Sequence, residues 1–243
     1  MSLSDAYLKT TRAKKHLDDL LKELAAFHES KPYEFQEKLD FENQRYRIRI
    51  KVKDPPEELS LIAGDIFCCL RASLDYLVWA LATLNTSSYA EHTQFPILEK
   101  EDAPRFEKQT KGVPAEAATI IESLQPYRAG DTQAIHRHLL WRLNKLCNID
   151  KHRRIPVYGS TVDFKLPHSI APFVMLEDDG VMSFPLKLKQ EVKIGCDPNN
   201  AFKVVFGDSY DGIECDKDGI KQIYEFVAEN VIPRFSRFST TAR

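Results

Sequence analysis

The chain has 243 residues, of which 43% are hydrophobic and 29% are charged, and its formal net charge at pH 7 is −2. This length and composition are typical of a globular protein with a sizeable core. The near-neutral charge excludes a protein that is basic over its whole surface, and it leaves only a local basic patch for binding nucleic acid.

The N-terminal part of the chain predicts one helix followed by a β-hairpin. Apolar residues recur at helical spacing over 4–30, and Pro32 ends this pattern. The segments YEFQEKLDF and RYRIRIKV then alternate apolar and polar residues, with a turn between them, so a hairpin is expected over 33–52. We interpret the Arg and Lys side of the second strand as a solvated sheet face, with a nucleic-acid-binding surface as the alternative.

Residues 57–84 predict a long central helix. The sequence DPPEE at its beginning is typical of a helix start, because aspartate can cap a helix and proline fits its first turn. One face carries Arg71, Asp75 and Tyr76 among small and aromatic residues, so we expect the helix to be buried on two sides. We expect the apolar stripe on the other face to pack within the chain, with a homodimer interface as the alternative. This near-heptad stripe comprises Leu59, Ile62, Ile66, Leu70, Leu74, Leu77, Leu81 and Leu84.

The rest of the chain predicts further helices and then strands. Residues 85–111 are expected to be irregular, and helices are expected over 114–123 and 132–148. Strand-like segments separated by turn residues follow within 155–207. Their sequences are IPVYGSTVDF, APFVML, VMSFPLKL and FKVVF. A final amphipathic helix is expected over 219–238.

These elements predict an α+β fold. A helical bundle is expected in which the central helix 57–84 packs with the N- and C-terminal helices. An antiparallel sheet is expected to combine the hairpin at 33–52 with strands within 155–207. We predict a single domain over 1–238 and a disordered tail at 239–243.

The sequence carries no signal for a membrane or for secretion. The most apolar segment, 66–84, contains Arg71 and Asp75, so it predicts a buried helix and no membrane span. The N-terminal residues are charged and amphipathic and lack the apolar region of a secretory signal. The five cysteines are odd in number and form no C-x-x-C pair. We therefore expect a cytoplasmic protein with reduced thiols and no membrane partner.

Most common catalytic and cofactor motifs are missing from the sequence. It has no G-x-G-x-x-G, Walker A, G-x-S-x-G, H-E-x-x-H or EF-hand loop, so we expect no cofactor of those classes and infer none of another kind. His136, His138, Cys147 and His152 lie close together in the sequence. However, His136 and His138 are two positions apart on a predicted helix and would point in different directions. We therefore expect no metal site.

Two groups of charged residues are candidates for a functional or structural role. Arg71 and Asp75 are i,i+4 neighbours in the central helix and can pair on one face. The sequence NIDKHR over 148–153 lies at the predicted end of another helix, where basic side chains complement the negative helix terminus. Because buried charges need partners, we expect the two groups to contact each other.

The expected contacts form a structural network that joins the helices to the start of the sheet. In this network Asp75 pairs with His152 or Lys151, and Asp150 pairs with Arg71. Asp150 and His152 are expected to point inward, whereas Lys151 and the neighbouring Arg154 are expected to be more exposed. Two further polar side chains are assigned to the same network: Asn148 and Tyr76.

Two sequence motifs carry a resemblance to known proteins. CLRASLDYLVWAL over 69–81 and LNKLCNIDKHRRI over 143–155 resemble a group of uncharacterised bacterial proteins. The corresponding motifs of that group read roughly L-R-S-A-L-D-H-L and N-x-D-K-H-R. The short segments Phe95-Pro96-Ile97 and Leu124-Gln125-Pro126-Tyr127 match the same group, so the resemblance covers most of residues 1–238.

The central helix is also similar to the R-x4-6-H signature of HEPN domains. These all-helical domains include many metal-independent RNases and nucleic-acid-binding partners in bacterial defence and toxin–antitoxin systems. Arg71 matches the arginine of the signature, whereas Tyr76 stands where the histidine would be. A tyrosine is a poor proton carrier near neutral pH because its pKa is about 10. The resemblance therefore assigns the imidazole role to His152.

An RNase of this kind would let an RNA 2′-hydroxyl attack the adjacent phosphorus. The roles implied by the resemblance are acid/base catalysis by His152, phosphate binding by Arg71, Lys151 and Arg153, and orientation of the imidazole by Asp75 or Asp150. The sequence leaves three functions open. They are nucleic-acid binding in a HEPN-like defence or toxin protein, metal-independent RNA cleavage, and a non-catalytic homodimeric interaction protein.

Overall fold

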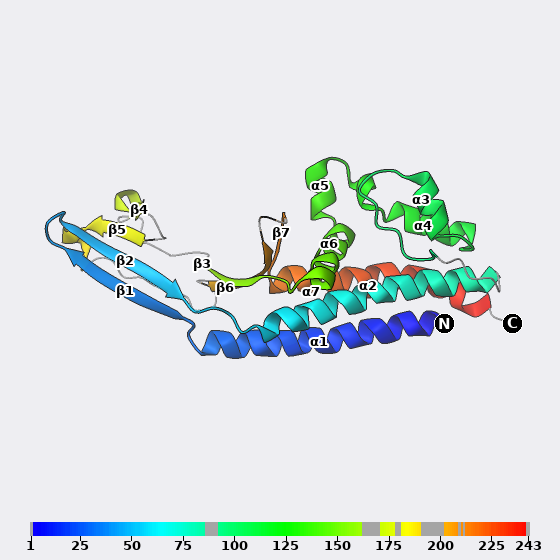
Figure 1. The fold of residues 1–243 in the computed structure, drawn as a ribbon, viewed down its shortest axis with the longest axis horizontal. Coiled ribbons are helices and arrows are strands. Elements are labelled where there is room, and N and C mark those ends of the chain that lie inside the picture. Colours follow the sequence, from blue (N-terminus) through cyan, green and yellow to red (C-terminus); the bar gives the residue numbers. More distant parts are fainter. Residues whose placement is uncertain are drawn as a thin grey trace. The chain divides into compact units, whose positions relative to one another are not determined.

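The computed structural model describes residues 2–85, 92–161, 171–177, 181–190, 202–208, 210 and 212–241. The protein has an α+β fold, as predicted, and its chain divides into two compact units (Figure 1). Unit 1 comprises Met1–Lys22, Glu57–Pro156 and Phe206–Arg243, and unit 2 comprises Glu23–Pro56 and Val157–Val205. The sequence predicts one domain, whereas each unit combines stretches that lie far apart in the chain.

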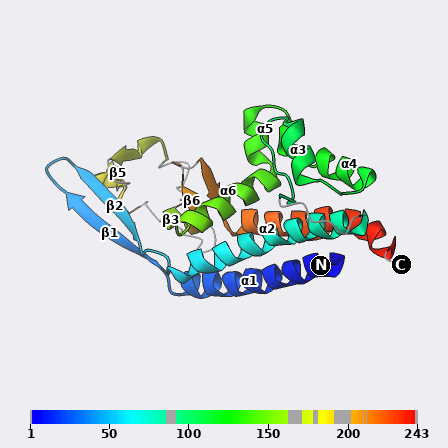
Figure 2. The same ribbon diagram turned by 45° about the vertical axis from the view of Figure 1, so that its right-hand side comes forward.

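Unit 1 is built around helix α2 (Glu58–Asn85) and the part of helix α1 (Leu3–Glu29) that ends at Lys22. The N-terminal part of α1 lies beside α2 in both views (Figures 1 and 2). Between the two helices, Lys9 Nζ lies 5.4 Å from the centre of the Tyr76 ring, and His16 Nδ1 lies 4.0 Å from Asp65 Oδ2. The two helices expected over 4–30 and 57–84 are therefore confirmed.

The apolar stripe of α2 is covered by other parts of unit 1. Six of its leucine and isoleucine side chains have no exposed surface: Leu59, Ile66, Leu70, Leu74, Leu77 and Leu81. Helix α6 (Leu139–His152), helix α7 (Lys217–Glu225) and the helical turns that follow α7 contact α2. The stripe is thus an intramolecular core, and it is not available as the homodimer interface that the sequence leaves open.

The C-terminal helix predicted over 219–238 is present but not uniform. After α7 the chain continues as a π-helical turn, Phe226–Val231, and then as a 3-10 helix, Ile232–Thr241. The apolar residues of this region, including Val227, Val231 and Phe235, are buried as their spacing predicts. The helix extends into the expected tail, whose last two residues lie outside the described part of the chain.

Helix α3 (Ala103–Gln109) lies in the segment that was expected to be irregular. Its start is specified locally, because Asp102 Oδ1 accepts a hydrogen bond from Arg105 N at 3.0 Å and Pro104 stands in the first turn. The expectation for 85–111 is therefore wrong over these seven residues. Helix α4 (Ala115–Ser123) confirms the helix predicted after Pro114.

The helix predicted over 132–148 is wrong as a single element. It is two helices, α5 (Thr132–Arg137) and α6, separated by His138, whose ψ of 129° is not helical. The side chain of His138 caps α6, since its Nδ1 accepts a hydrogen bond from Leu140 N at 3.2 Å. A histidine that serves as an N-cap is not distinguished from a mid-helix residue by hydrophobic spacing, so the break was not predicted.

Unit 2 contains a four-stranded antiparallel sheet in the order β1-β2-β5-β4. Its strands are β1 (Tyr33–Asp40), β2 (Arg45–Val52), β4 (Met175–Glu177) and β5 (Val181–Pro185). The sheet confirms that the hairpin combines with strands from 155–207. Its apolar face forms a small core of Tyr46, Ile48, Met182 and Phe184. The alternation of β2 therefore determines which face is buried.

A second sheet has the strand order β3-β6-β7, with strands β3 (Val157–Thr161), β6 (Phe202–Asp208) and β7 (Ile213–Cys215). Strands β6 and β7 pair in antiparallel fashion, with Phe206 opposite Cys215. Gly207 has a φ of +94°, and a Cβ there would lie 2.3 Å from the carbonyl oxygen of Ile213, so this position requires glycine. Residues 162–164, the end of the strand-like segment expected over 155–164, lie outside the described residues.

None of the helices in the described ranges combines the length and the apolar character that a membrane crossing requires.

Candidate functional site

Arg71 and Asp75 form the ion pair that their i,i+4 spacing predicts. Arg71 Nη2 lies 2.9 Å from Asp75 Oδ1 and also donates to the carbonyl oxygen of Phe95 at 2.7 Å. The backbone N–H of Phe95 donates to Asp75 Oδ1 at 2.9 Å. Burial raises the pKa of Asp75, and the positive charge of Arg71 opposes this rise. The ion pair therefore satisfies both the carbonyl oxygen and the N–H group of Phe95.

The segment that follows Phe95 is fixed from its other side by Gln125, which is almost fully buried. Gln125 Nε2 donates to the carbonyl oxygen of Pro96 at 2.9 Å, and its Oε1 accepts from Leu98 N at 3.1 Å. The segments 95–97 and 124–127, both part of the resemblance, thus contact each other. Arg71, Asp75 and Gln125 serve to fix a loop against the helices.

The end of α6 presents different residues to two sides, because successive helix residues point about 100° apart. Asp150 faces α2, as predicted: its carboxylate lies against Gly64 and accepts a hydrogen bond from Cys68 Sγ at 3.4 Å. Its partner is thus Cys68, and the predicted pairing of Asp150 with Arg71 is wrong. His152 is exposed and makes no hydrogen bond or ion pair with Asp75, so its inward orientation is also wrong.

The two residues that were expected to be exposed, Lys151 and Arg154, are exposed. Arg154 forms an ion pair with Glu57 at the start of α2. The positive charge of Lys151 acts on Asp75 and favours its ionised form. The sequence predicts His152 or Lys151 as the partner of Asp75, and Lys151 is the one whose charge acts on the pKa of Asp75.

A cleft of about 410 Å³ lies along the side of α6 that carries His152. Its lining includes the buried side chains of Trp141 and Ile149. Its polar lining is formed by Glu99, Asn144, Lys145, Asn148, His152 and Arg153. The cleft lies entirely within unit 1, and it combines three basic side chains, two amides and one carboxylate.

Trp141 fixes the position of the carboxylate in this cleft. Its indole Nε1 donates a hydrogen bond to Glu99 Oε1 at 2.7 Å. The ring of His136 stacks on Trp141 with a centroid distance of 4.3 Å and an interplanar angle of 23°. The indole cannot turn without losing both contacts, so Glu99 is held at one edge of the cleft.

The structure brings only part of the predicted site together. Asn148, His152 and Arg153 line the cleft, whereas Arg71 and Asp75 do not. Tyr76 lies under Lys9 of α1. Sequence reasoning missed four lining residues: Glu99, Trp141, Asn144 and Lys145. Three of the polar lining residues stand at positions 144, 148 and 152, a spacing of four that marks one helix face and could have identified it.

Within the described ranges, no group of three or more His, Cys, Asp or Glu side chains could hold a metal ion. The residues considered from the sequence have other roles, since His136 stacks on Trp141 and His138 caps α6.

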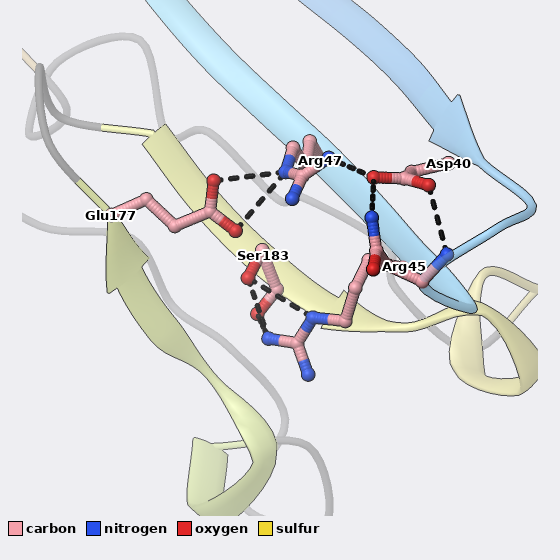
Figure 3. Close-up of polar contacts among 6 residues, drawn as sticks. Asp40, Arg45, Arg47, Glu177 and Ser183 are labelled. Carbon is pink, nitrogen blue, oxygen red and sulfur yellow. Dashed lines mark hydrogen bonds and ion pairs between the residues drawn. The ribbon is translucent and has the colours of Figure 1, made fainter.

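Unit 2 has a second polar surface, on the Arg and Lys face of its sheet (Figure 3). Arg47 forms ion pairs with Asp40 and with Glu177, whose Oε2 lies 2.8 Å from Arg47 Nε. Arg45 Nη2 donates to the carbonyl oxygen of the buried Ser183 at 3.0 Å. Hydrogen bonds from Ser183 and from Arg47 lower the pKa of Glu177. These carboxylates offset much of the positive charge, which favours a structural role for this face.

Comparisons of the chain with family models, curated proteins and solved structures found no match. The resemblance to HEPN domains therefore stays a prediction from the sequence.

Proposed function

We propose that the protein binds single-stranded RNA through the cleft along α6. The observation that carries this proposal is that Asn148, His152 and Arg153 line the same cleft as Asn144 and Lys145. The first three belong to the motif over 148–153 that resembles a group of uncharacterised bacterial proteins. The other two extend its basic and amide character along one turn of the helix.

The chemical groups of the cleft match those of a nucleotide chain. Lys145 and Arg153 supply cations for phosphate oxygens, and the exposed His152 adds a third group that is cationic when protonated. The side-chain amides of Asn144 and Asn148 can both donate and accept hydrogen bonds, as base edges and a 2′-hydroxyl require.

The size of the cleft favours a single strand over a duplex. Its volume of about 410 Å³ lies in the range of ~300–1,000 Å³ that is usual for small-ligand sites. A cleft of this size can take one splayed nucleotide and its phosphates, whereas duplex binding by phosphate contacts uses an extended basic surface. A net charge of −2 is consistent with such local recognition.

The test is a binding titration of a fluorescently labelled RNA oligonucleotide followed by anisotropy. Lys145→Glu places a negative charge in the cleft, and we expect it to weaken binding at least about tenfold and to reduce the salt dependence of affinity. Lys108→Glu makes the same charge change on the exposed surface of α3 and should have little effect. Equal binding by the two variants would overturn the proposal.

A second candidate function is RNA cleavage, and it is favoured by the fixed position of Glu99 in the cleft that His152 lines. In this reaction the Glu99 carboxylate takes the proton of a 2′-hydroxyl, whose oxygen attacks the adjacent phosphorus. The His152 imidazolium then protonates the leaving 5′-oxygen, and Lys145 and Arg153 hold the charge on phosphorus. Arg71 has no part in this step because it does not line the cleft.

Cleavage would produce one RNA end with a 2′,3′-cyclic phosphate and one with a 5′-hydroxyl. Glu99→Gln and His152→Ala should each slow cleavage by about 10²- to 10⁴-fold while the protein still binds RNA. The measurement is the rate at which cyclic-phosphate ends appear. Wild-type protein that binds RNA and generates no such ends would leave binding as the function and eliminate cleavage.

A further inference from the structure

Two cysteines that are far apart in the sequence are neighbours in unit 1. Cys68 on α2 and Cys147 on α6 are separated by 79 positions, yet their sulfur atoms lie 3.9 Å apart. Both are free thiols, and Cys68 is partly exposed whereas Cys147 is buried. Cys69, the sequence neighbour of Cys68, is not part of this pair. Burial raises its pKa, and the charges of Lys9 on α1 and of Asp65 act on it.

The surroundings make the two thiols chemically unequal. The Cys68 S–H can donate to Cys147 Sγ or to Asp150 Oδ2, which lies 3.4 Å away. The hydrogen bond from Cys68 lowers the pKa of Cys147, and the positive charges of Lys151 and Arg71 act in the same direction. The same hydrogen bond raises the pKa of Cys68. Cys147 is therefore the thiol that ionises first, and Cys68 is the one that keeps its proton.

We propose that Cys68 and Cys147 form a redox pair that a hydroperoxide oxidises to a disulfide between α2 and α6. This inference is independent of the proposed RNA binding, because neither sulfur lies in the α6 cleft. The contact distance of 3.9 Å is larger than the S–S bond length of about 2.05 Å. Side-chain rotation and a small approach of the two packed helices would close that difference.

The oxidation takes place in two balanced steps. In the first, the Cys147 thiolate attacks one oxygen of the peroxide, the O–O bond breaks, and the product is a Cys147 sulfenic acid and, after uptake of a proton, water. In the second, Asp150 takes the proton of Cys68. The Cys68 sulfur then attacks the sulfenic sulfur, the S–O bond breaks, and the leaving hydroxide takes the proton from Asp150 and departs as a second water. Two thiols and one hydrogen peroxide thus give one disulfide and two waters.

The first test treats the reduced full chain with a stoichiometric amount of hydrogen peroxide. Peptide mass spectrometry without reductant should then find the Cys68 and Cys147 peptides joined within one chain, with the loss of two hydrogen atoms. Thermal melting of the folded protein should shift upward on oxidation, and added reductant should reverse the shift. A cross-link through Cys69, a cross-link between chains, or sulfonic acids without this disulfide would overturn the proposal.

Variants then distinguish the order of the two steps. In Cys68→Ser the reaction should stop at a sulfenic acid on Cys147, which dimedone traps, whereas Cys147→Ser should yield none on Cys68. Cys69→Ser is the matched control, because it removes the adjacent thiol and should leave the disulfide yield unchanged. Asp150→Asn should slow disulfide closure without slowing sulfenic acid formation, because the negative charge of Asp150 raises the pKa of Cys147 and its removal favours the thiolate. Trapping on Cys68 in Cys147→Ser would contradict the assignment of the first nucleophile.

Discussion

Arg71 and Asp75 form a 2.9 Å ion pair on α2 whose main role is to fix a neighbouring loop. The two side chains satisfy the carbonyl oxygen and the N–H of Phe95, whose ring is fully buried. Buried backbone groups without partners destabilise a fold. The charges that resemble a catalytic signature in the sequence therefore have a structural function here, and the candidate site lies on another element.

Replacing Arg71 with methionine should destabilise the protein by about 3 kcal/mol. The change leaves the Asp75 charge and the Phe95 carbonyl group without their partner in a largely buried place. Urea unfolding at pH 7 measures the loss. Lys14→Ala is the matched control, since it breaks an i,i+4 ion pair with Asp18 that is exposed to solvent, and it should cost less than about 0.5 kcal/mol. Similar losses for both variants would contradict the structural role.

The effect of alanine at Gly64 should depend on the residue at position 150. A Cβ at Gly64 would lie 2.2 Å from Asp150 Oδ1, so Gly64→Ala must displace that side chain and should destabilise the protein by about 1–3 kcal/mol. In an Asp150→Ala background the clash is absent. The higher helix propensity of alanine should then make the same change stabilising by up to ~1 kcal/mol.

A double-mutant cycle measured by urea unfolding tests this reversal of sign. If Gly64→Ala has the same effect in both backgrounds, then Asp150 does not occupy the position against α2 that the structure gives it.

His138 should make the stability of the protein depend on pH below neutrality. Burial lowers its pKa from the ordinary 6.5, and its Nδ1 must be unprotonated to accept the hydrogen bond from Leu140 N. The contribution is present above the unfolded-state pKa of about 6.5 and is lost as the pH falls through the folded-state pKa. His138→Asn keeps a capping side chain that does not titrate.

Urea unfolding at pH 7.5 and pH 5 should therefore show a larger loss of stability for the wild type than for His138→Asn. An equal loss in the two proteins would show that protonation of His138 does not break the cap of α6.

Asp40 should contribute to the acid stability of the sheet in unit 2. Hydrogen bonds from Asn43 and Arg47 hold the pKa of Asp40 well below its ordinary value of 3.8. Its contribution is therefore present above the unfolded-state pKa and is lost as the pH falls through the lower folded-state pKa. Asp40→Asn should be less stable than the wild type at pH 7, and the difference should shrink by pH 3. If the stability difference between the wild type and Asp40→Asn is the same at pH 7 and pH 3, the Asp40 carboxylate does not make this contribution.

The fold could be predicted where one face of an element is uniformly apolar. The stripe of α2 and the alternation of β2 each specify a buried side. The long helices α1 and α2 and the four-stranded sheet could be predicted from patterns of this kind. Local capping decided what the patterns missed. Asp102 starts α3, and His138 divides the expected helix over 132–148, although neither changes the hydrophobic spacing.

The candidate site could be predicted only in part. Most of its residues lie on α6, and the sequence did not show which side of that helix packs against α2. The charged residues of 148–153 were recognised, but Asp150 and His152 were both expected to point inward. Two residues that are two positions apart in a helix point about 200° apart, so only one of them can face α2. Glu99 and Trp141 could not be placed at the cleft, since a contact between two residues 42 positions apart leaves no periodic signal in the sequence.

The most direct test of RNA binding uses Trp141 as a reporter inside the cleft. The chain has two tryptophans, so Trp79→Phe leaves Trp141 as the single source of tryptophan emission. If RNA occupies the cleft, its titration should change the Trp141 emission to saturation, with the same midpoint as the anisotropy of labelled RNA, and Lys145→Glu should shift both midpoints together. RNA that binds by anisotropy while the Trp141 emission stays constant would contradict the assignment of the site.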